Sequence, residues 1–309
     1  MLGLIGNTPL VSLQPLIPCD CRIFGKVEFL NPGGSVKDRI AVALVLDAEE
    51  RNVLKPGGTI VEPTSGNTGA SLAMVAAVRG YRCILVTPEK TSAEKVAAMR
   101  AYGAQVIVAP NVPVDDSRHY TRVASRIAAE TGAYMPDQYA NPVNALTCEK
   151  TIGAEIWQQT GGKVTHVVAG LGTGGTACGV ARALKSRKES ATIVGVEPVG
   201  SVYSGAAAKA FEVEGIGRHY VPASLDMSLI DRVEIVSDLE AFEMARRAAR
   251  EAGLLVGGSS GAALVGAARV CAQARQDAYI VVILPDSGRA YLSKIFNDEY
   301  LAKIASGGG

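Results

Sequence analysis

The chain has 309 residues, of which 48% are hydrophobic and 20% charged, so it is long enough for one large or two modest domains with a substantial core. Its 31 Lys and Arg nearly balance 30 Asp and Glu, which gives no electrostatic reason to expect a nucleic acid or an anionic membrane as a partner. No apolar run reaches the length of a membrane span, and the first residues do not resemble a secretory signal, so we expect a cytoplasmic protein.

Short apolar runs alternate with segments of helical spacing along the chain. The first series predicts helices at residues 38–50, 67–79 and 93–102, interleaved with strands at 59–62, 83–87 and 105–109. After a polar loop at 110–116, the second series predicts strands at 164–170, 192–197, 232–236 and 279–284, with helices at 178–186, 238–251 and 260–273. Alternation of this kind is typical of parallel sheets covered by helices. We therefore predict an α/β fold in two clusters that divide near residue 145, with residues 306–309 disordered.

Cysteine and histidine give no sign of a metal site. The six cysteines form no C-x-x-C pair and are scattered through apolar patterns, which favours reduced, structural thiols; they are Cys19, Cys21, Cys83, Cys148, Cys178 and Cys271. Cys19 and Cys21 form a C-x-C, but no further Cys or His lies near them in sequence. The three histidines are far apart and lack ligand spacing. We expect no metal.

Ligands of open α/β sheets bind where strands end, so the strand-to-helix loops are the places to look for chemistry. The loop GLGTGGT, at residues 170–176, follows a predicted strand and opens a helix. Its glycines let backbone N–H groups converge, and the helix start adds positive potential. We interpret it as a phosphate-binding loop, with a plain tight turn as the alternative.

The same loop also matches the dinucleotide pattern G-x-G-x-x-G through Gly170, Gly172 and Gly175. Glu197 ends the next strand, about where an acid that binds ribose would lie. An NAD-dependent dehydrogenase is therefore a competing hypothesis from another class of enzyme. Thr173 and Thr176 add hydroxyls that suit a terminal phosphate monoester better.

Three further loops carry candidate residues. EPTSGNTG, at 62–69, places small hydroxyl and amide side chains at a helix start and suits a carboxylate, although a plain helix cap has the same composition. In NPGGSVKDR, at 31–39, Lys37 stands at a helix start, where the dipole disfavours its charged form, as Schiff-base chemistry requires. By itself such a lysine is more often a solvated surface group. LPDSGR, at 284–289, is another loop after a predicted strand with a small hydroxyl, and by itself it is only a weak sign of a functional site.

Taken together, GSVKDR, EPTSGNTG and GTGGT resemble the cysteine synthase and cystathionine β-synthase family of fold-type II pyridoxal-phosphate enzymes. The resemblance extends from IGNTPL at 5–10 to PDSGRAYLSKIF at 285–296. It implies pyridoxal 5'-phosphate as the cofactor and a fold like that of the tryptophan synthase β chain. It also implies a smaller, mobile, substrate-closing domain at 38–145, a larger cofactor-binding domain formed by 1–37 and 146–309, and a homodimer.

The resemblance also implies a role for individual residues. Lys37 is expected to form the Schiff base and to act as the catalytic base, and Asn67 to bind the 3′-oxygen of the cofactor. Ser287 is expected to face the pyridine nitrogen, where a neutral hydroxyl favours β-elimination over transamination. The phosphate-binding residues are expected to be Gly172, Thr173, Gly174, Gly175 and Thr176. The carboxylate-binding residues are expected to be Thr64, Ser65, Asn67, Thr68 and Gln138.

The implied reaction is β-replacement on L-serine or O-acetyl-L-serine through an aminoacrylate, with a thiol as acceptor. NPGGSVKDR, DQYANP, EGIG at 214–217 and LPDSGRAYLSKIFND favour the cystathionine β-synthase branch, which uses serine and homocysteine. A cysteine synthase that uses O-acetylserine and sulfide, or a specialised enzyme with another nucleophile, stays open. Ala145 and Cys148 stand where the family usually has proline and histidine, and Arg218 also departs from the pattern, which puts the second substrate in doubt.

Overall fold

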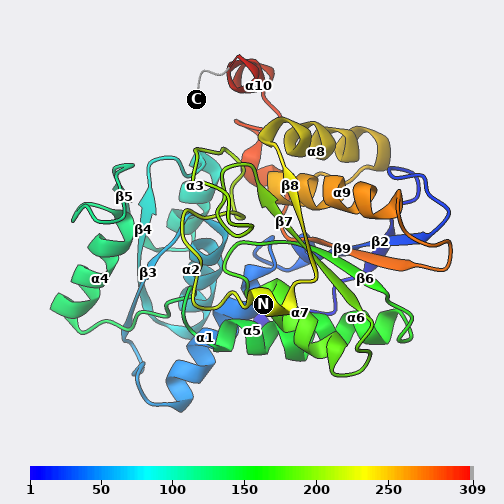
Figure 1. Cartoon of the computed structure of the whole chain (residues 1–309). Helices are drawn as coiled ribbons and strands as arrows, with labels where there is room; N and C mark the ends of the chain where they lie inside the picture. The colour runs from blue at the N-terminus through cyan, green and yellow to red at the C-terminus, as the bar shows by residue number, and fades with distance from the viewer. Residues whose placement is uncertain (307–309) are drawn as a thin grey trace.

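Two mostly parallel sheets, each flanked by helices, organise the computed structural model, which describes residues 1–306 (Figure 1). The smaller sheet has the order β3-β4-β5 and is parallel throughout: Thr59–Pro63, Arg82–Pro88 and Gln105–Ala109. The larger sheet has the order β1-β2-β9-β6-β7-β8: Leu10–Ser12, Arg22–Val27, Tyr279–Leu284, His166–Gly170, Thr192–Pro198 and Arg232–Val236. The predicted fold class is confirmed.

Helices cover both faces of each sheet. The smaller sheet packs with α1 (Lys37–Glu50), α2 (Asn67–Arg79), α3 (Ala93–Ala101) and α4 (Tyr120–Thr131). The larger sheet has α8 (Asp238–Ala252) and α9 (Gly258–Cys271) on one side, and α5 (Val143–Cys148), a π-helical segment (Glu149–Gly153), α6 (Ala154–Gln159) and α7 (Gly175–Lys185) on the other. The last helix is α10 (Asp298–Ala305), and short 3₁₀ turns lie at Leu2–Leu4, Glu28–Leu30, Met227–Leu229 and Gly288–Tyr291.

Alternate residues of the central strands pack into two separate hydrophobic cores, one on each face of the larger sheet. Val168 of β6 and Val282 of β9 join the core under α8 and α9, while Val167 and Val281 join the core under α5 to α7. Successive side chains of a strand point to opposite faces, so a strand buried on both faces is apolar without interruption. This explains why these strands were readily predicted from short apolar runs.

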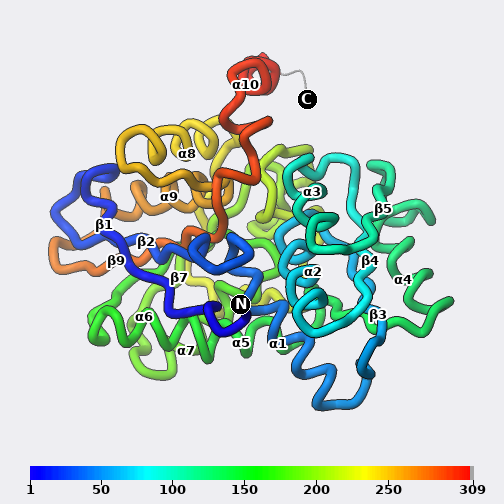
Figure 2. The backbone as a smooth tube through the Cα atoms, turned by 180° about the vertical axis from the view of Figure 1, so that it is seen from behind, coloured from blue at the N-terminus to red at the C-terminus, as the bar shows by residue number. Residues whose placement is uncertain are grey.

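The sequence prediction missed the edge formed by β1 and β2, which Figure 2 shows beside β9. β1 and β2 are antiparallel, whereas β2 and β9 are parallel. β2 contains Lys26 and therefore does not read as an apolar run. The Lys26 ammonium is nevertheless fully buried and lies 2.5 Å from Glu155 Oε2. The helices α4, α5, α6 and α10 were also missed; α5 and α6 have only six residues each.

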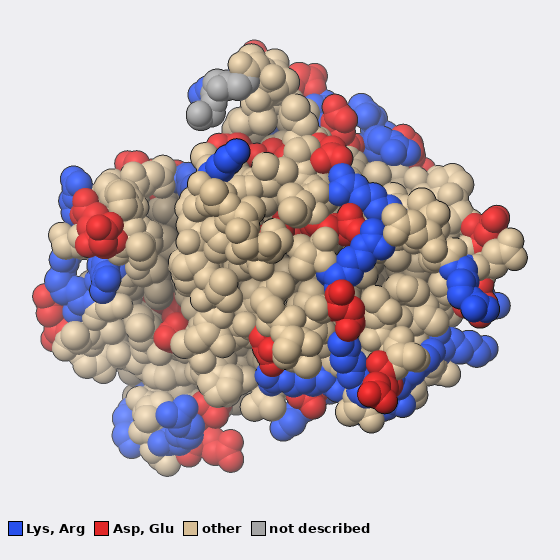
Figure 3. All heavy atoms as spheres, viewed as in Figure 1, with Lys and Arg blue, Asp and Glu red and all other residues tan. Residues whose placement is uncertain are grey.

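The expectations for the surface and the end of the chain are met only in part. Within residues 1–306, no helix is both long and apolar enough to cross a bilayer. Acidic and basic side chains are interspersed on the face shown in Figure 3, in keeping with a net charge of +1. Ser306 caps α10, whereas the rest of the segment predicted to be disordered, 307–309, lies outside the described residues.

Candidate functional site

Lys37 is the first residue of α1, as predicted. The turn before it is tied to the loop after β9: Ser35 and Asp286 form an antiparallel bridge, and Val36 N donates to Pro285 O at 2.8 Å. Gly34 has a φ of +83°, a left-handed conformation that glycine adopts without strain. The fold therefore fixes Lys37 against the loop that contains Ser287, although 250 residues separate the two in sequence.

The surroundings of Lys37 disfavour its charged form. Burial lowers the pKa of the Lys37 ammonium, and the positive charge of Arg218 lowers it further, while Cys148 and Asp286 oppose the shift. Its side chain still keeps some solvent exposure. An uncharged amine in a mostly buried site is suited to act as a nucleophile or a base.

Asn67, the first residue of α2, reaches the same loop. Asn67 Nδ2 donates to Asp286 Oδ2 at 2.7 Å, and Tyr291 OH donates to the same oxygen at 2.5 Å. Asp286 Oδ1 is buried and has no partner among the described residues. Ser287 pairs with Val256 in an antiparallel bridge, and its Oγ accepts from Arg289 N at 3.2 Å. Lys37, Asn67 and Ser287 thus converge on one loop.

The loop between β3 and α2 has the form expected of an anion site. Thr68 Oγ1 donates to Gln138 Oε1 at 2.6 Å, so the predicted partner from the DQYANP segment does meet this loop. Thr64 Oγ1 accepts from Gly66 N and Gly69 N, both at 3.1 Å, which gives its hydroxyl a role in shaping the turn. Ser65 lines the cavity described below.

The predicted phosphate loop runs from the end of β6 to the start of α7. Thr173 Oγ1 accepts from Gly175 N at 3.3 Å, and Gly174 has a φ of +85°. A Cβ at Gly172 would lie 2.4 Å from Gly215 O, so no other residue fits there without a shift of the backbone. Thr176 follows in the first turn of α7. The arrangement leaves backbone N–H groups at a helix start, which is where phosphates bind.

Asn144 links these two loops and was missed from the sequence. Asn144 Nδ2 donates to Gln138 O at 2.9 Å and to Thr173 Oγ1 at 3.1 Å, so one buried amide joins the phosphate loop to Gln138, the partner of Thr68 in the carboxylate loop. Asn144 Oδ1 is buried without a partner among the described residues. The last residue of NPVN was the available signal, but an asparagine in a polar segment does not reveal its contacts.

Two of the three departures from the family pattern, Cys148 and Arg218, influence the pKa of Lys37 electrostatically. Cys148 is buried, its Sγ donates to Thr176 Oγ1 at 3.8 Å, and burial raises the pKa of its thiol to about 11. Arg218 donates to Tyr139 OH at 2.8 Å and lies over that ring at 5.0 Å. Its Nε is buried without a partner in the described part of the chain. Ala145 is buried in α5 and contributes no side-chain polar atom.

A cavity of about 580 Å³ is lined by Arg218 and by Ser65 of the loop between β3 and α2. Both sequence clusters contribute to it: Ser65, Lys90 and His119 from the first, and Glu214, Arg218 and Lys294 from the second. Glu214 lines this cavity, and its Oε2 accepts from the buried Lys95 Nζ at 2.8 Å, which also donates to Tyr291 OH at 2.7 Å. The sequence did not single out Lys95, because a lysine within a helix looks like a solvated residue.

Glu197 is not placed as the dehydrogenase hypothesis requires. Its carboxylate is buried and accepts from Tyr203 N at 3.0 Å and Ser204 N at 2.9 Å, so it is used to hold its own loop. Tyr203 OH in turn donates to Gly172 O at 2.7 Å. Glu197 therefore supports the phosphate loop indirectly, because it holds the segment that contains Tyr203.

Comparison with known proteins points to one family. Residues 1–286 match the model described as pyridoxal-phosphate dependent enzyme. The chain is 43% identical, over 97% of its length, to the cystathionine beta-synthases of Apis mellifera and Oryctolagus cuniculus, and it covers 62% and 57% of those proteins. It therefore spans less than two thirds of these relatives. A crystal structure of O-ureido-L-serine synthase superposes with a TM-score of 0.91 at 36% identity, covering 97% of this chain and 98% of that one.

Proposed function

The chain belongs to the family of pyridoxal-phosphate dependent enzymes, and from that premise we propose that it replaces the β-substituent of a serine-type amino acid. The observation that carries the proposal is the convergence of Lys37, Asn67 and Ser287 on the loop after β9, beside a glycine-rich helix start. Family membership decides against the dehydrogenase hypothesis.

The residues present fit the cofactor. The backbone at 172–176 forms a glycine-rich cradle at the start of α7, and a Cβ at Gly172 or Gly174 would enter neighbouring atoms. Asn67 and Ser287 offer an amide and a neutral hydroxyl, and Lys37 offers an amine with a lowered pKa. When bound, pyridoxal phosphate acts as an electron sink for the carbon next to the substrate amine.

The side chains of this chain then have distinct tasks. Lys37 Nζ would hold the cofactor before substrate arrives and afterwards take the α-proton, which its lowered pKa favours. The Thr68–Gln138 pair, with Ser65 and the backbone of the β3–α2 loop, would bind the substrate carboxylate. Ser287 would place a neutral hydroxyl beside the pyridine nitrogen of the cofactor. Without a charged partner there, the ring stores less negative charge, which favours expulsion of the β-substituent.

For the substrates we favour L-serine and homocysteine, the pair expected of the cystathionine β-synthase branch, whose relatives are 43% identical. O-acetylserine with sulfide is the alternative. A specialised acceptor is favoured by a specific observation: Cys148 and Arg218 change the surroundings of Lys37, and the superposed structure is named for O-ureido-L-serine. We further propose that segment 38–145 closes over substrate, and that the enzyme is a cytoplasmic homodimer.

The test has two stages. The purified protein is expected to be yellow, to lose its visible band on borohydride reduction, and to carry the reduced adduct on Lys37 by mass spectrometry. A colourless protein that cannot be reconstituted, or an adduct on another lysine, contradicts the site. Spectra with serine and with O-acetylserine, followed by sulfide or homocysteine, then identify the donor and acceptor; no spectral change with either donor contradicts the β-replacement proposal.

A further inference from the structure

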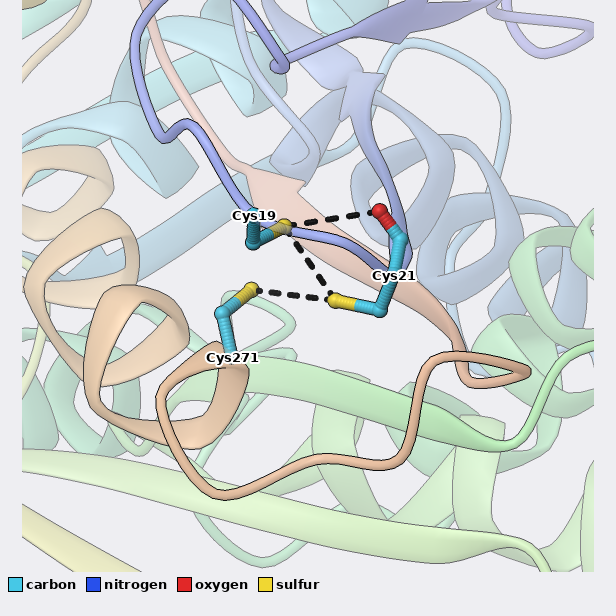
Figure 4. A group of neighbouring side chains, drawn as sticks. All are labelled: Cys19, Cys21 and Cys271. Carbon is cyan, nitrogen blue, oxygen red and sulfur yellow. Dashed lines mark hydrogen bonds between the residues drawn. The ribbon is translucent and has the colours of Figure 1, made fainter.

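Three cysteine sulfurs meet away from the site described above. Cys19 Sγ lies 3.2 Å from Cys21 Sγ, and Cys21 Sγ lies 3.7 Å from Cys271 Sγ (Figure 4). All three sulfurs lie within 4.8 Å of one another, and each thiol is free. These separations are far longer than the roughly 2.05 Å of a disulfide bond. None of the three cysteines is among the predicted catalytic or cofactor-binding residues.

The fold brings together what the sequence keeps apart. Cys19 and Cys21 lie on the loop that leads into β2, and Cys271 is the last residue of α9. Gln14 Nε2 donates to Cys19 O at 2.8 Å and to Cys21 O at 2.7 Å, and this holds the loop in a tight curve. The curve turns both sulfurs toward the end of α9, as Figure 4 shows.

The spacing suits a metal ion bound by sulfur. A zinc–sulfur bond of about 2.3 Å in tetrahedral geometry places neighbouring sulfurs about 3.8 Å apart. The Cys21–Cys271 distance already matches this value, and the Cys19–Cys21 pair needs to open by about 0.6 Å. Cys19 is the partly exposed member of the group, on a loop, so it has room to make that adjustment. Thiolates select soft ions over Mg²⁺ or Ca²⁺.

The cluster is also accessible. A cavity of about 520 Å³ is lined by all three cysteines and by Asp20, Met244 and Arg247. This opening gives an ion a path to the buried sulfurs and leaves room for a water molecule as fourth ligand. The thioether of Met244, which also lines this cavity, suits a soft ion.

We propose that Cys19, Cys21 and Cys271 form a three-thiolate site for a thiophilic cation, Zn²⁺ or Cu⁺, that fastens the loop before β2 to the end of α9. Each cysteine releases its proton to solvent as the metal–sulfur bond forms, and no change of oxidation state is required. The site is independent of the proposed reaction, because its ligands take no part in it.

The experiment uses the reduced, metal-free holoenzyme. Zn²⁺ is titrated against a chromophoric chelator, and Cu⁺ is titrated without oxygen against a chelator specific for Cu⁺. We expect one equivalent of at least one ion per chain, and affinity lower by at least about tenfold in Cys271→Ser and Cys19→Ser. Cys19→Ser changes a partly exposed position, so it remains informative if Cys271→Ser does not fold. The matched control is Cys83→Ser, another buried free cysteine, which should bind as the wild type does.

The comparison of the two ions decides which of them the site prefers. The proposal is wrong if neither ion binds, or if Cys271→Ser and Cys19→Ser bind as tightly as the wild type. It is also wrong if the reduced protein binds no metal and air oxidation yields a disulfide among these cysteines. The readout is metal stoichiometry and affinity, so a failure here leaves the proposed reaction untouched.

Discussion

Lys95 Nζ on α3 lies 2.8 Å from Glu214 Oε2, in an ion pair that joins a helix beside the smaller sheet to a loop of the larger one. Both side chains are nearly buried, with 3% and 9% of their surface exposed. The same ammonium donates to Tyr291 OH, which donates to Asp286, the neighbour of Ser287. These hydrogen bonds therefore connect Glu214, which lines the cavity, to the loop that holds the proposed site.

The first prediction concerns this pair. Lys95→Met leaves the Glu214 carboxylate with Lys294 alone and removes a donor to Tyr291. We expect it to destabilise the fold by about 3 kcal/mol, because breaking a buried ion pair leaves a poorly compensated charge. Denaturant unfolding of Lys95→Met, Glu214→Gln and the double variant measures the coupling, for which we expect about 1–3 kcal/mol. Strictly additive effects would contradict a direct interaction.

The second prediction concerns Arg218. Its charge lowers the pKa of Lys37, so Arg218→Gln should raise that pKa toward its ordinary value. A base that must be uncharged to act then needs a higher pH, and the acidic limb of the pH–rate profile should move to higher pH. Arg275→Gln, which changes a mostly exposed arginine, is the control. An unmoved acidic limb in Arg218→Gln would show that the charge does not act on Lys37.

The third prediction concerns Asn144, which donates to Gln138 O and Thr173 Oγ1. Asn144→Ala should raise the dissociation constant of pyridoxal phosphate and the KM of the amino-acid donor together, each by about fivefold, since each lost hydrogen bond is worth about 1 kcal/mol. Fluorescence titration of the apoenzyme and steady-state kinetics provide the two values. The nearby Asn141→Ala is the control, because its side chain bonds only within its own turn. A change in only one value would argue against a shared support.

The fourth prediction concerns stability at low pH. Burial by itself would raise the pKa of the Glu155 carboxyl, but hydrogen bonds from Arg39 and Lys26 hold it at about 2. Since the folded pKa lies below the ordinary glutamate value of 4.5, its stabilisation is complete above about pH 4.5 and is lost as the pH falls toward 2. The loss should reach about 3 kcal/mol.

Unfolding free energies measured between pH 6 and pH 2.5 should fall less steeply in Glu155→Gln than in the wild type, from a lower starting value. Equal slopes in both proteins would contradict this account of Glu155. Glu130→Gln, which removes an exposed carboxylate near the end of α4, should keep the wild-type slope.

The sequence by itself determined the fold class, the apolar strands such as β6 and β9, and the four loops expected to carry chemistry. Strands buried on both faces appear in the sequence as apolar runs, and glycines and hydroxyls at strand ends mark anion sites. Both signals lie within short segments of the chain, so they can be recognised without the tertiary structure. The predicted phosphate and carboxylate loops do lie at helix starts, and Thr68 does meet Gln138.

Only the tertiary structure decided which polar residues are buried together. Lys26 in β2, Lys95 in α3 and Asn144 in α5 look like surface residues in sequence, yet each is held by partners brought from distant segments. The same holds for Cys271, which lies 250 residues from Cys21 and joins it through the packing of α9 against the sheet. Burial of a polar group is favourable only when its partners are in place, and those partners are set by the packing of sheets and helices, which no local pattern records.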